Sequence, residues 1–319
     1  MKNYLLLTLV GLLIISCNSK SKVEQEIEKI PIDVEIIRFD KAFAKATPND
    51  LPQLKKEYPS FFPEQYNDSI WIDKITDTLQ NQLEEEVFKV FPDNSSLTDV
   101  LVPLFQHIKY YFPKFKTPAV VAATSDVDYR NKVILADSLL IIAVDNYLGS
   151  EHEFYKGIER YIAKGMKPSQ VGPDVAAAYS KHYIKPPKQR RFLEQIVYYG
   201  KQLYLKDLWL PAVSKAEKIG YTGEEYEWAE ENEEYMWRYF IEKELLYSTD
   251  PKLAARFVNP APFSKFYLEI DNESPGMLGR YLGWKIVNAY MNNTDTSVQQ
   301  LMVTKADEIF KNSKYKPKK

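Results

Sequence analysis

The three histidines of the chain are the side chains best suited to hold a catalytic metal, and their spacing argues against one. No two of His107, His152 and His182 are four residues apart, so the chain contains no His-Glu-x-x-His helix. A catalytic zinc needs three protein ligands in one shell and an open fourth position. We therefore expect no catalytic metal and no cofactor, with each histidine at the surface or in a hydrogen bond.

Other catalytic arrangements are also missing from the sequence. There is no Gly-x-Ser-x-Gly turn for a nucleophilic serine and no glycine-rich phosphate loop. Carboxylates occur in runs, at residues 84–86 and 230–234, and such runs are typical of the solvated face of a helix. A glycosidase would need two opposed carboxylates in a cleft, which a sequence cannot show. We predict a protein without enzymatic activity, and a hydrolase that uses carboxylates stays open as an alternative.

Cys17 is the one cysteine of the chain, and it closes a short leader. Lys2 gives the leader a positive start, and residues 5–15 form an apolar run. A bilayer-spanning helix needs ~20 apolar residues, so this run is typical of a signal peptide. The small residue Ser16 followed by a cysteine resembles the lipobox of bacterial lipoproteins. The resemblance implies cleavage before Cys17 and a diacylglycerol on its sulfur, with an acylated amine. An ordinary signal peptide with an incidental cysteine is the alternative.

The composition favours one large folded unit behind this leader. Hydrophobic residues make up 45% of the 319 residues and aromatic residues 14%, which is ample for a core. We predict a signal peptide over 1–16, a polar tether over 17–30, a single domain over 31–313, and a frayed basic tail over 314–319.

Charge and cysteine usage exclude several classes of protein. The formal net charge is −2 and no basic patch dominates the sequence, so we expect no nucleic-acid partner. A single cysteine excludes intramolecular disulfides and sites with several thiolate ligands.

The pattern of apolar residues changes near Gly149. Before it, helix spacing covers residues 83–91 and 97–112, with Pro103 as a kink or late start. Short β-prone runs cover 118–123, 132–136 and 139–144, and a looser one covers 32–39. After Gly149 the spacing is almost wholly helical. The sequence predicts an α+β fold, mostly α, in which a small sheet from the N-terminal half packs on a helical C-terminal half.

Several local signals mark the helices of the C-terminal half. Asp174 is a candidate N-cap for a helix over 175–183, and Thr222 with Glu225 forms a capping box ahead of a helix that reaches residue 245. Pro275 and Gly276 form a turn before a helix over 278–291, and a last amphipathic helix covers 298–310. Gly279 and Gly283 lie four residues apart, so one side of the 278–291 helix is smooth enough to pack closely on a neighbour.

The C-terminal half also carries an ordered set of motifs. They are Tyr198 to Tyr204, Ile219 to Thr222, Trp228, Asn232 with Glu233, Glu244 to Asp250, Arg256 with Phe257, Pro260 to Tyr267, Ser274 to Gly276, and Gly283 to Val287. This set resembles the gliding-motility lipoprotein family GldB. The resemblance covers nearly the whole chain. It implies a lipoprotein that is required for gliding over surfaces and linked to the motility and secretion apparatus of the cell envelope.

A weaker resemblance concerns the fold alone. The order of a small sheet, helices and a helix after a glycine turn is similar to zinc peptidases of the His-Glu-x-x-His class. In such a fold the metal-binding helix would fall near residues 175–182, where Ala176, Ala177 and Ala178 stand, and a Glu-Gly pair would fall at Tyr199 and Gly200. Both positions lack ligands, so the resemblance implies a degenerate peptidase-like fold without its metal.

The segment from Pro260 to Tyr267 is the best candidate for a partner surface. It combines two prolines with several aromatic residues, so it suits neither a helix nor a central strand. The candidate residues are Phe263, Phe266 and Tyr267 with Trp284 of the following helix. If the rings face outward they form a partner surface, and if they face inward the segment is a structural strap over the core. The strap is the favoured interpretation, and Trp284 also suits a core position.

Together these features predict a lipid-anchored component of the gliding machinery that faces the periplasm, with the inner or outer membrane left open. Its expected partners are other envelope proteins of gliding motility. A degenerate or active hydrolase on a metallopeptidase-like fold is one alternative. A ligand- or glycan-binding lipoprotein is another, and a deep aromatic-lined cavity would favour it.

Overall fold

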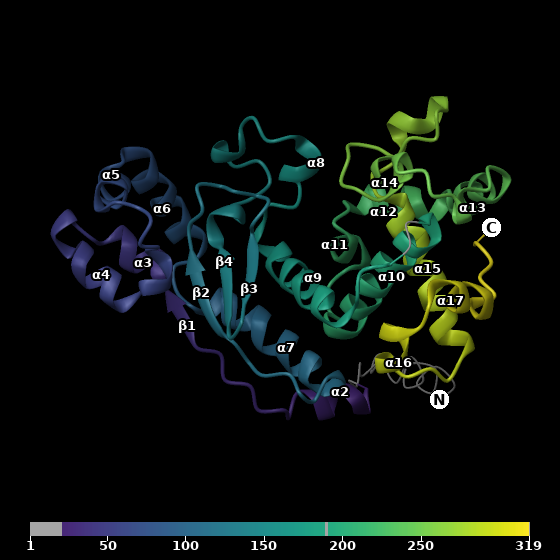
Figure 1. The fold of residues 1–319 in the computed structure, drawn as a ribbon, viewed down its shortest axis with the longest axis horizontal. Coiled ribbons are helices and arrows are strands. Elements are labelled where there is room, and N and C mark those ends of the chain that lie inside the picture. Colours follow the sequence, from purple (N-terminus) through teal and green to yellow (C-terminus); the bar gives the residue numbers. More distant parts are fainter. Residues whose placement is uncertain (1–20, 189–190, 319) are drawn as a thin grey trace, which may run out of the picture.

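A four-stranded sheet forms the centre of the N-terminal half (Figure 1). The computed structural model describes residues 21–188 and 191–318. The strands are β1 (Ile36–Arg38), β2 (Ala119–Ala123), β3 (Val133–Ala136) and β4 (Leu139–Ala143), in the order β1-β2-β4-β3. β2 pairs in parallel with both β1 and β4, whereas β3 and β4 form an antiparallel pair. The α+β prediction is confirmed, although the run over 32–39 forms only the three-residue strand β1.

Burial explains the composition of these strands. The sequence Ala-Val-Val-Ala-Ala of the inner strand β2 is buried almost throughout, as expected for a parallel strand covered on both faces. The outer strand β3 alternates between half-buried and exposed residues. Its position at the edge of the sheet leaves one face to solvent.

Helices make up most of the remaining fold. They are α2 (Lys22–Ile27), α3 (Phe39–Ala44), α4 (Leu51–Glu57), α5 (Asp68–Thr76), α6 (Thr78–Val90), α7 (Ser95–Tyr111), α8 (Arg160–Ala163), α9 (Val171–Tyr183), α10 (Phe192–Trp209), α11 (Lys215–Ile219), α12 (Gly223–Glu231), α13 (Glu233–Glu242), α14 (Lys252–Phe257), α15 (Leu278–Asn293), α16 (Val298–Val303) and α17 (Ala306–Ser313). One large core joins the sheet to α7, α9, α10 and α15, and a small second core lies among α3, α4 and α5.

Three predicted helix boundaries are corrected. α9 begins at Val171, so Asp174 lies in its first turn instead of capping it. The Asp174 carboxylate instead accepts a hydrogen bond from the Tyr147 hydroxyl at 3.0 Å and pairs with Lys132 at 2.5 Å. The helix after the Thr222 capping box ends at Glu231, and α13 follows Asn232, whose side-chain amide caps the Trp228 carbonyl at 2.9 Å. The last amphipathic segment is likewise two helices, α16 and α17.

α10 and α15 pack against each other at glycines, as the sequence predicted for Gly283 (Figure 1). A Cβ atom on Gly283 would lie within 3.0 Å of the Ile196 carbonyl, and one on Gly200 within 3.0 Å of the Gly283 carbonyl. The two backbones therefore touch at Gly283 and Gly200, where a side chain on either glycine would hold the helices apart.

Both ends of the described chain are docked on the domain. Ile27 of α2 is fully buried, the side chain of Gln106 donates hydrogen bonds to the Glu28 and Ile30 carbonyls, and His107 lies 3.1 Å from Glu24. Residues 21–30 of the predicted tether are thus packed on α7. At the other end, Tyr315 donates to buried Glu233 at 2.7 Å, so the predicted fraying is wrong for this part of the tail.

Candidate functional site

The structure places the four residues of the predicted partner surface in different environments. Phe266 is 2% exposed and Trp284 1% exposed, so both belong to the core. Phe263 is half-buried, and Tyr267 is 70% exposed. A partner surface on this segment would therefore depend on Tyr267 and Phe263 alone.

The segment is held in one conformation by polar contacts. The backbone N–H groups of Phe266 and Tyr267 both donate to the Asp271 carboxylate, at 2.9 and 2.8 Å. The Arg256 guanidinium donates to the Lys265 carbonyl at 2.7 Å and stacks on the Tyr267 ring, 4.5 Å from its centroid. Tyr267 has a left-handed backbone, with φ 64°. These contacts fix Tyr267 outside while Phe266 enters the core.

Replacing Phe266 with alanine is expected to destabilise the domain by ~3–5 kcal/mol, because a buried phenylalanine leaves a cavity when it is removed. Its ring lies 5.0 Å from those of Tyr239 and Phe257, inside an aromatic cluster. Tyr267→Ala is the matched control, and we expect it to change the free energy of unfolding by less than about 1 kcal/mol. Urea denaturation followed by tryptophan fluorescence measures the free energy of unfolding of the two variants. Equal losses of stability would contradict the interpretation of this segment as a structural strap over the core.

The three histidines stay apart. His107 on α7 pairs with Glu24, His152 lies 3.3 Å from Glu86, and His182 lines a groove next to Tyr183. Among residues 21–188 and 191–318, no three His, Cys, Asp or Glu side chains could hold a metal ion together. The expectation that the protein binds no catalytic zinc stays a prediction.

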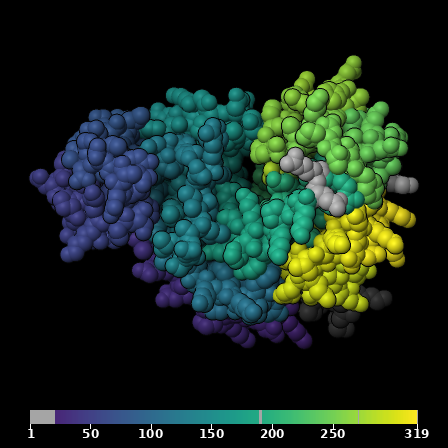
Figure 2. All heavy atoms as spheres, in the orientation of Figure 1, coloured from purple at the N-terminus to yellow at the C-terminus, as the bar shows by residue number. Residues whose placement is uncertain are grey.

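A small cavity of about 160 Å³ lies where α9, α10, α11 and α15 meet. Figure 2 shows a hollow between the teal and green parts of the surface, in the region of these helices. Ala177 of α9 and Tyr199 of α10 line the cavity, together with Gln202. Ala177 lies in the segment where the peptidase resemblance would place the metal-binding helix, and Tyr199 stands where it would place a glutamate ligand.

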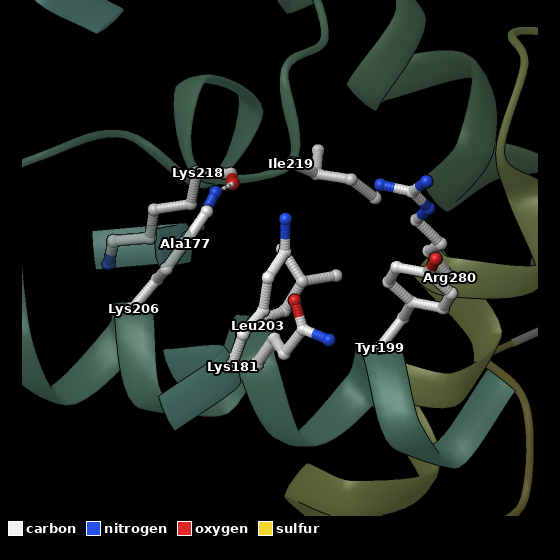
Figure 3. Close-up of a pocket in the computed structure, with 9 residues that line it drawn as sticks. Ala177, Lys181, Tyr199, Leu203, Lys206, Lys218, Ile219 and Arg280 are labelled. Carbon is white, nitrogen blue, oxygen red and sulfur yellow. Dashed lines mark hydrogen bonds between the residues drawn. The ribbon is translucent and has the colours of Figure 1, made fainter. Parts of the chain in front are cut away.

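Cations dominate the polar wall of this cavity. Lys181 stands at its mouth, Lys206 and Lys218 lie on one side, and Arg280 lies on the other side next to Tyr199 (Figure 3). The Lys206 ammonium donates to the Lys218 carbonyl at 2.8 Å. Burial lowers the pKa of the Lys206 ammonium to about 8 and also lowers the pKa of the Arg280 guanidinium. The protein therefore keeps positive charge in a place where the charged form is disfavoured.

Buried Trp284 helps to organise one side of the cavity. Its indole N–H donates to the Asp207 carboxylate at 2.7 Å, and Asp207 pairs with Lys218 at 3.1 Å. Trp284 therefore acts on the cavity wall from within the core, the first of the two positions, core or partner surface, that the sequence allowed.

The comparison with known proteins decides the family. A model of the family described as gliding motility protein GldB matches residues 20–317. The chain belongs to the GldB family. No curated protein and no solved structure matches it. The family is associated with gliding motility and is one of lipoproteins, which are held at membranes of the cell envelope. The peptidase-like part of the fold prediction has no such support and stays a prediction.

The basic cavity of this GldB-family chain was not found in the sequence, although a partial signal existed. Tyr199, Gln202 and Lys206 follow one another at spacings of three and four residues, so they share a face of α10. This face of α10 carries Lys206, although most of the helix is apolar. Lys218 and Arg280 come from other helices, and only tertiary packing brings them together.

Cys17, the predicted site of lipid attachment, lies outside the described residues. The described chain starts just after it, at Ser21, which accepts a hydrogen bond from the Glu24 N–H at the start of α2. Among the described residues, no helix is long and apolar enough to cross a bilayer.

Proposed function

We propose that the chain is a lipid-anchored, non-enzymatic component of the gliding machinery that faces the periplasm and works by binding other envelope proteins. The observation that carries this proposal is the GldB family match, which begins at residue 20, just after Cys17. A lipid on Cys17 would hold every part of the matched region at a membrane.

The short distance between Cys17 and the docked α2 supports a membrane-proximal position. Four residue steps separate Cys17 from Ser21, and an extended chain covers at most about 14 Å in four steps. Because residues 21–30 pack on α7, the acyl chains would hold the α2 and α7 side of the domain close to the membrane. The opposite side would then be free for partners.

The chemistry of the cavity supports a role in binding. The positions that would carry metal ligands in a peptidase are held by alanine and tyrosine, and the charged side chains lining the cavity are lysines and an arginine. These cations suit recognition of an anion better than hydrolysis of a peptide.

Glycan or small-ligand binding is a second candidate function, and one observation favours it. A groove of about 930 Å³ runs beside the cavity-forming helix α9 and is lined by the rings of Tyr111, Phe112, Phe115, Tyr179 and Tyr183. Aromatic rings offer flat apolar faces with polar rims, which suit such ligands.

Site-specific crosslinking in living cells tests the partner proposal. A photoreactive phenylalanine analogue replaces Tyr267, and the control carries it at Leu79, which is 62% exposed on α6. We expect a defined adduct with an envelope protein from position 267 and none from position 79. The captured protein should itself be needed for gliding. Equal labelling from both positions, or none from position 267, would contradict a partner contact at Tyr267.

A further inference from the structure

The basic cavity has more positive charge than its surroundings neutralise. Lys218 is paired with Asp207. Among the residues that the structure describes, no carboxylate lies within 4.0 Å of Lys181, Lys206 or Arg280. Burying a cation without a partner is costly. This cost falls on Lys206 and Arg280, which are half-buried, whereas Lys181 is exposed at the mouth. A bound anion would reduce it.

The donors of the cavity wall are arranged for an anion of limited size. The Nε–H of Arg280 donates a hydrogen bond to the Val258 carbonyl at 2.6 Å. The Arg280 guanidinium lies over the Tyr199 ring, 4.0 Å from its centroid. This leaves the planar fork of Arg280 oriented and available, a geometry that suits the oxygens of phosphate or carboxylate. Lys206 lies on the opposite side of the cavity, whereas the Lys218 side chain points away from Arg280 and pairs with Asp207 (Figure 3).

We propose that this cavity binds a phosphoryl group, held by Arg280, Lys206 and Lys181. A volume of about 160 Å³ is small beside the ~300–1,000 Å³ of pockets that hold drug-sized ligands, so the cavity takes the charged group and not a large molecule. Three unpaired cations match a doubly charged phosphoryl group better than a singly charged carboxylate. The group can belong to free phosphate or to a lipid headgroup. The inference rests on the cavity and does not depend on the proposed role in gliding.

The proposal includes a dependence on pH. Lys206 is faced by Lys181 and Asp174 of α9, by Arg280 of α15 and by Lys132, and Asp174 is already engaged by Lys132 and Tyr147. Since the pKa of Lys206 in the free protein is about 8, its ammonium is charged below that pH and neutral above it. Binding should therefore weaken as the pH rises from 7 to 9. Lys206→Met should bind more weakly at pH 7 and show a flatter pH profile.

Calorimetric titration of the detergent-solubilised full-length protein with inorganic phosphate tests the proposal. We expect Lys206→Met and Lys181→Met each to weaken binding by about tenfold or more, because a hydrogen bond to a charged group contributes on this scale. Lys181 is exposed, so its replacement leaves the fold intact. Lys185→Met is the control, since Lys185 is exposed and does not line the cavity.

A parallel titration with dihexanoyl phosphatidic acid separates the two sources of the phosphoryl group. Tighter binding of this soluble lipid than of phosphate identifies a headgroup site, and the reverse identifies free phosphate. The proposal is overturned if the wild-type protein binds neither probe, or if Lys206→Met and Lys181→Met bind phosphate as tightly as Lys185→Met.

Discussion

Gly283→Ala is expected to lower the free energy of unfolding by about 3 kcal/mol or more, at the upper end of the usual cost of overpacking. The added Cβ would lie within 3.0 Å of the carbonyl carbon and oxygen of Ile196. Both are backbone atoms of α10, so no side chain can turn away to make room. The two helices would have to separate along the contact that joins α10 to α15.

Gly223→Ala is the control for this experiment. Gly223 lies at the first position of α12, and a Cβ there would meet nothing within 4 Å. We expect its unfolding free energy to stay within about 0.5 kcal/mol of the wild type. Chemical denaturation of the two variants side by side gives the comparison. A Gly283→Ala protein as stable as Gly223→Ala would show that α10 and α15 are not in backbone contact.

Cys17→Ala is expected to abolish lipid attachment and to remove the protein from the washed membrane fraction. Two or three acyl chains provide stable anchoring, whereas the described domain has no membrane-spanning helix to replace them. Metabolic labelling with palmitate and fractionation of the cells measure the two effects. Ser16→Ala keeps a small residue before the cysteine, so it should be labelled and anchored like the wild type.

If palmitate is still incorporated into the Cys17→Ala protein, the lipid is attached elsewhere. Membrane retention without palmitate would instead point to a protein or surface contact as the anchor. Either result would remove Cys17 from its proposed role while leaving the family assignment in place.

Much of the fold could be predicted because its signals are local. The runs that form β2, β3 and β4 have the β-branched and aliphatic residues typical of strands, and Thr222 with Glu225 forms the predicted capping box. The close packing at Gly283 could be predicted because Gly279 and Gly283 leave one side of the helix without side chains. Asp174 was misassigned because its carboxylate is engaged by Lys132 and Tyr147, residues that are distant in sequence.

The candidate site was less predictable for the same reason. The cavity takes its cations from α9, α10, α11 and α15, so no single segment carries its signature. In the segment from Pro260 to Tyr267, the aromatic composition alone could not show that Phe266 is buried and Tyr267 exposed. The Asp271 carboxylate, which binds both backbone N–H groups, fixes one ring inside and the next outside.

Gliding of a strain that lacks the gene tests the central claim most directly. The speed of single cells on a surface is measured for the deletion strain, for the same strain with the wild-type gene restored, and for one with Cys17→Ala. We predict that the deletion strain and the Cys17→Ala strain do not glide and that the wild-type gene restores movement. A deletion strain that glides at the wild-type speed would contradict a role of this protein in gliding.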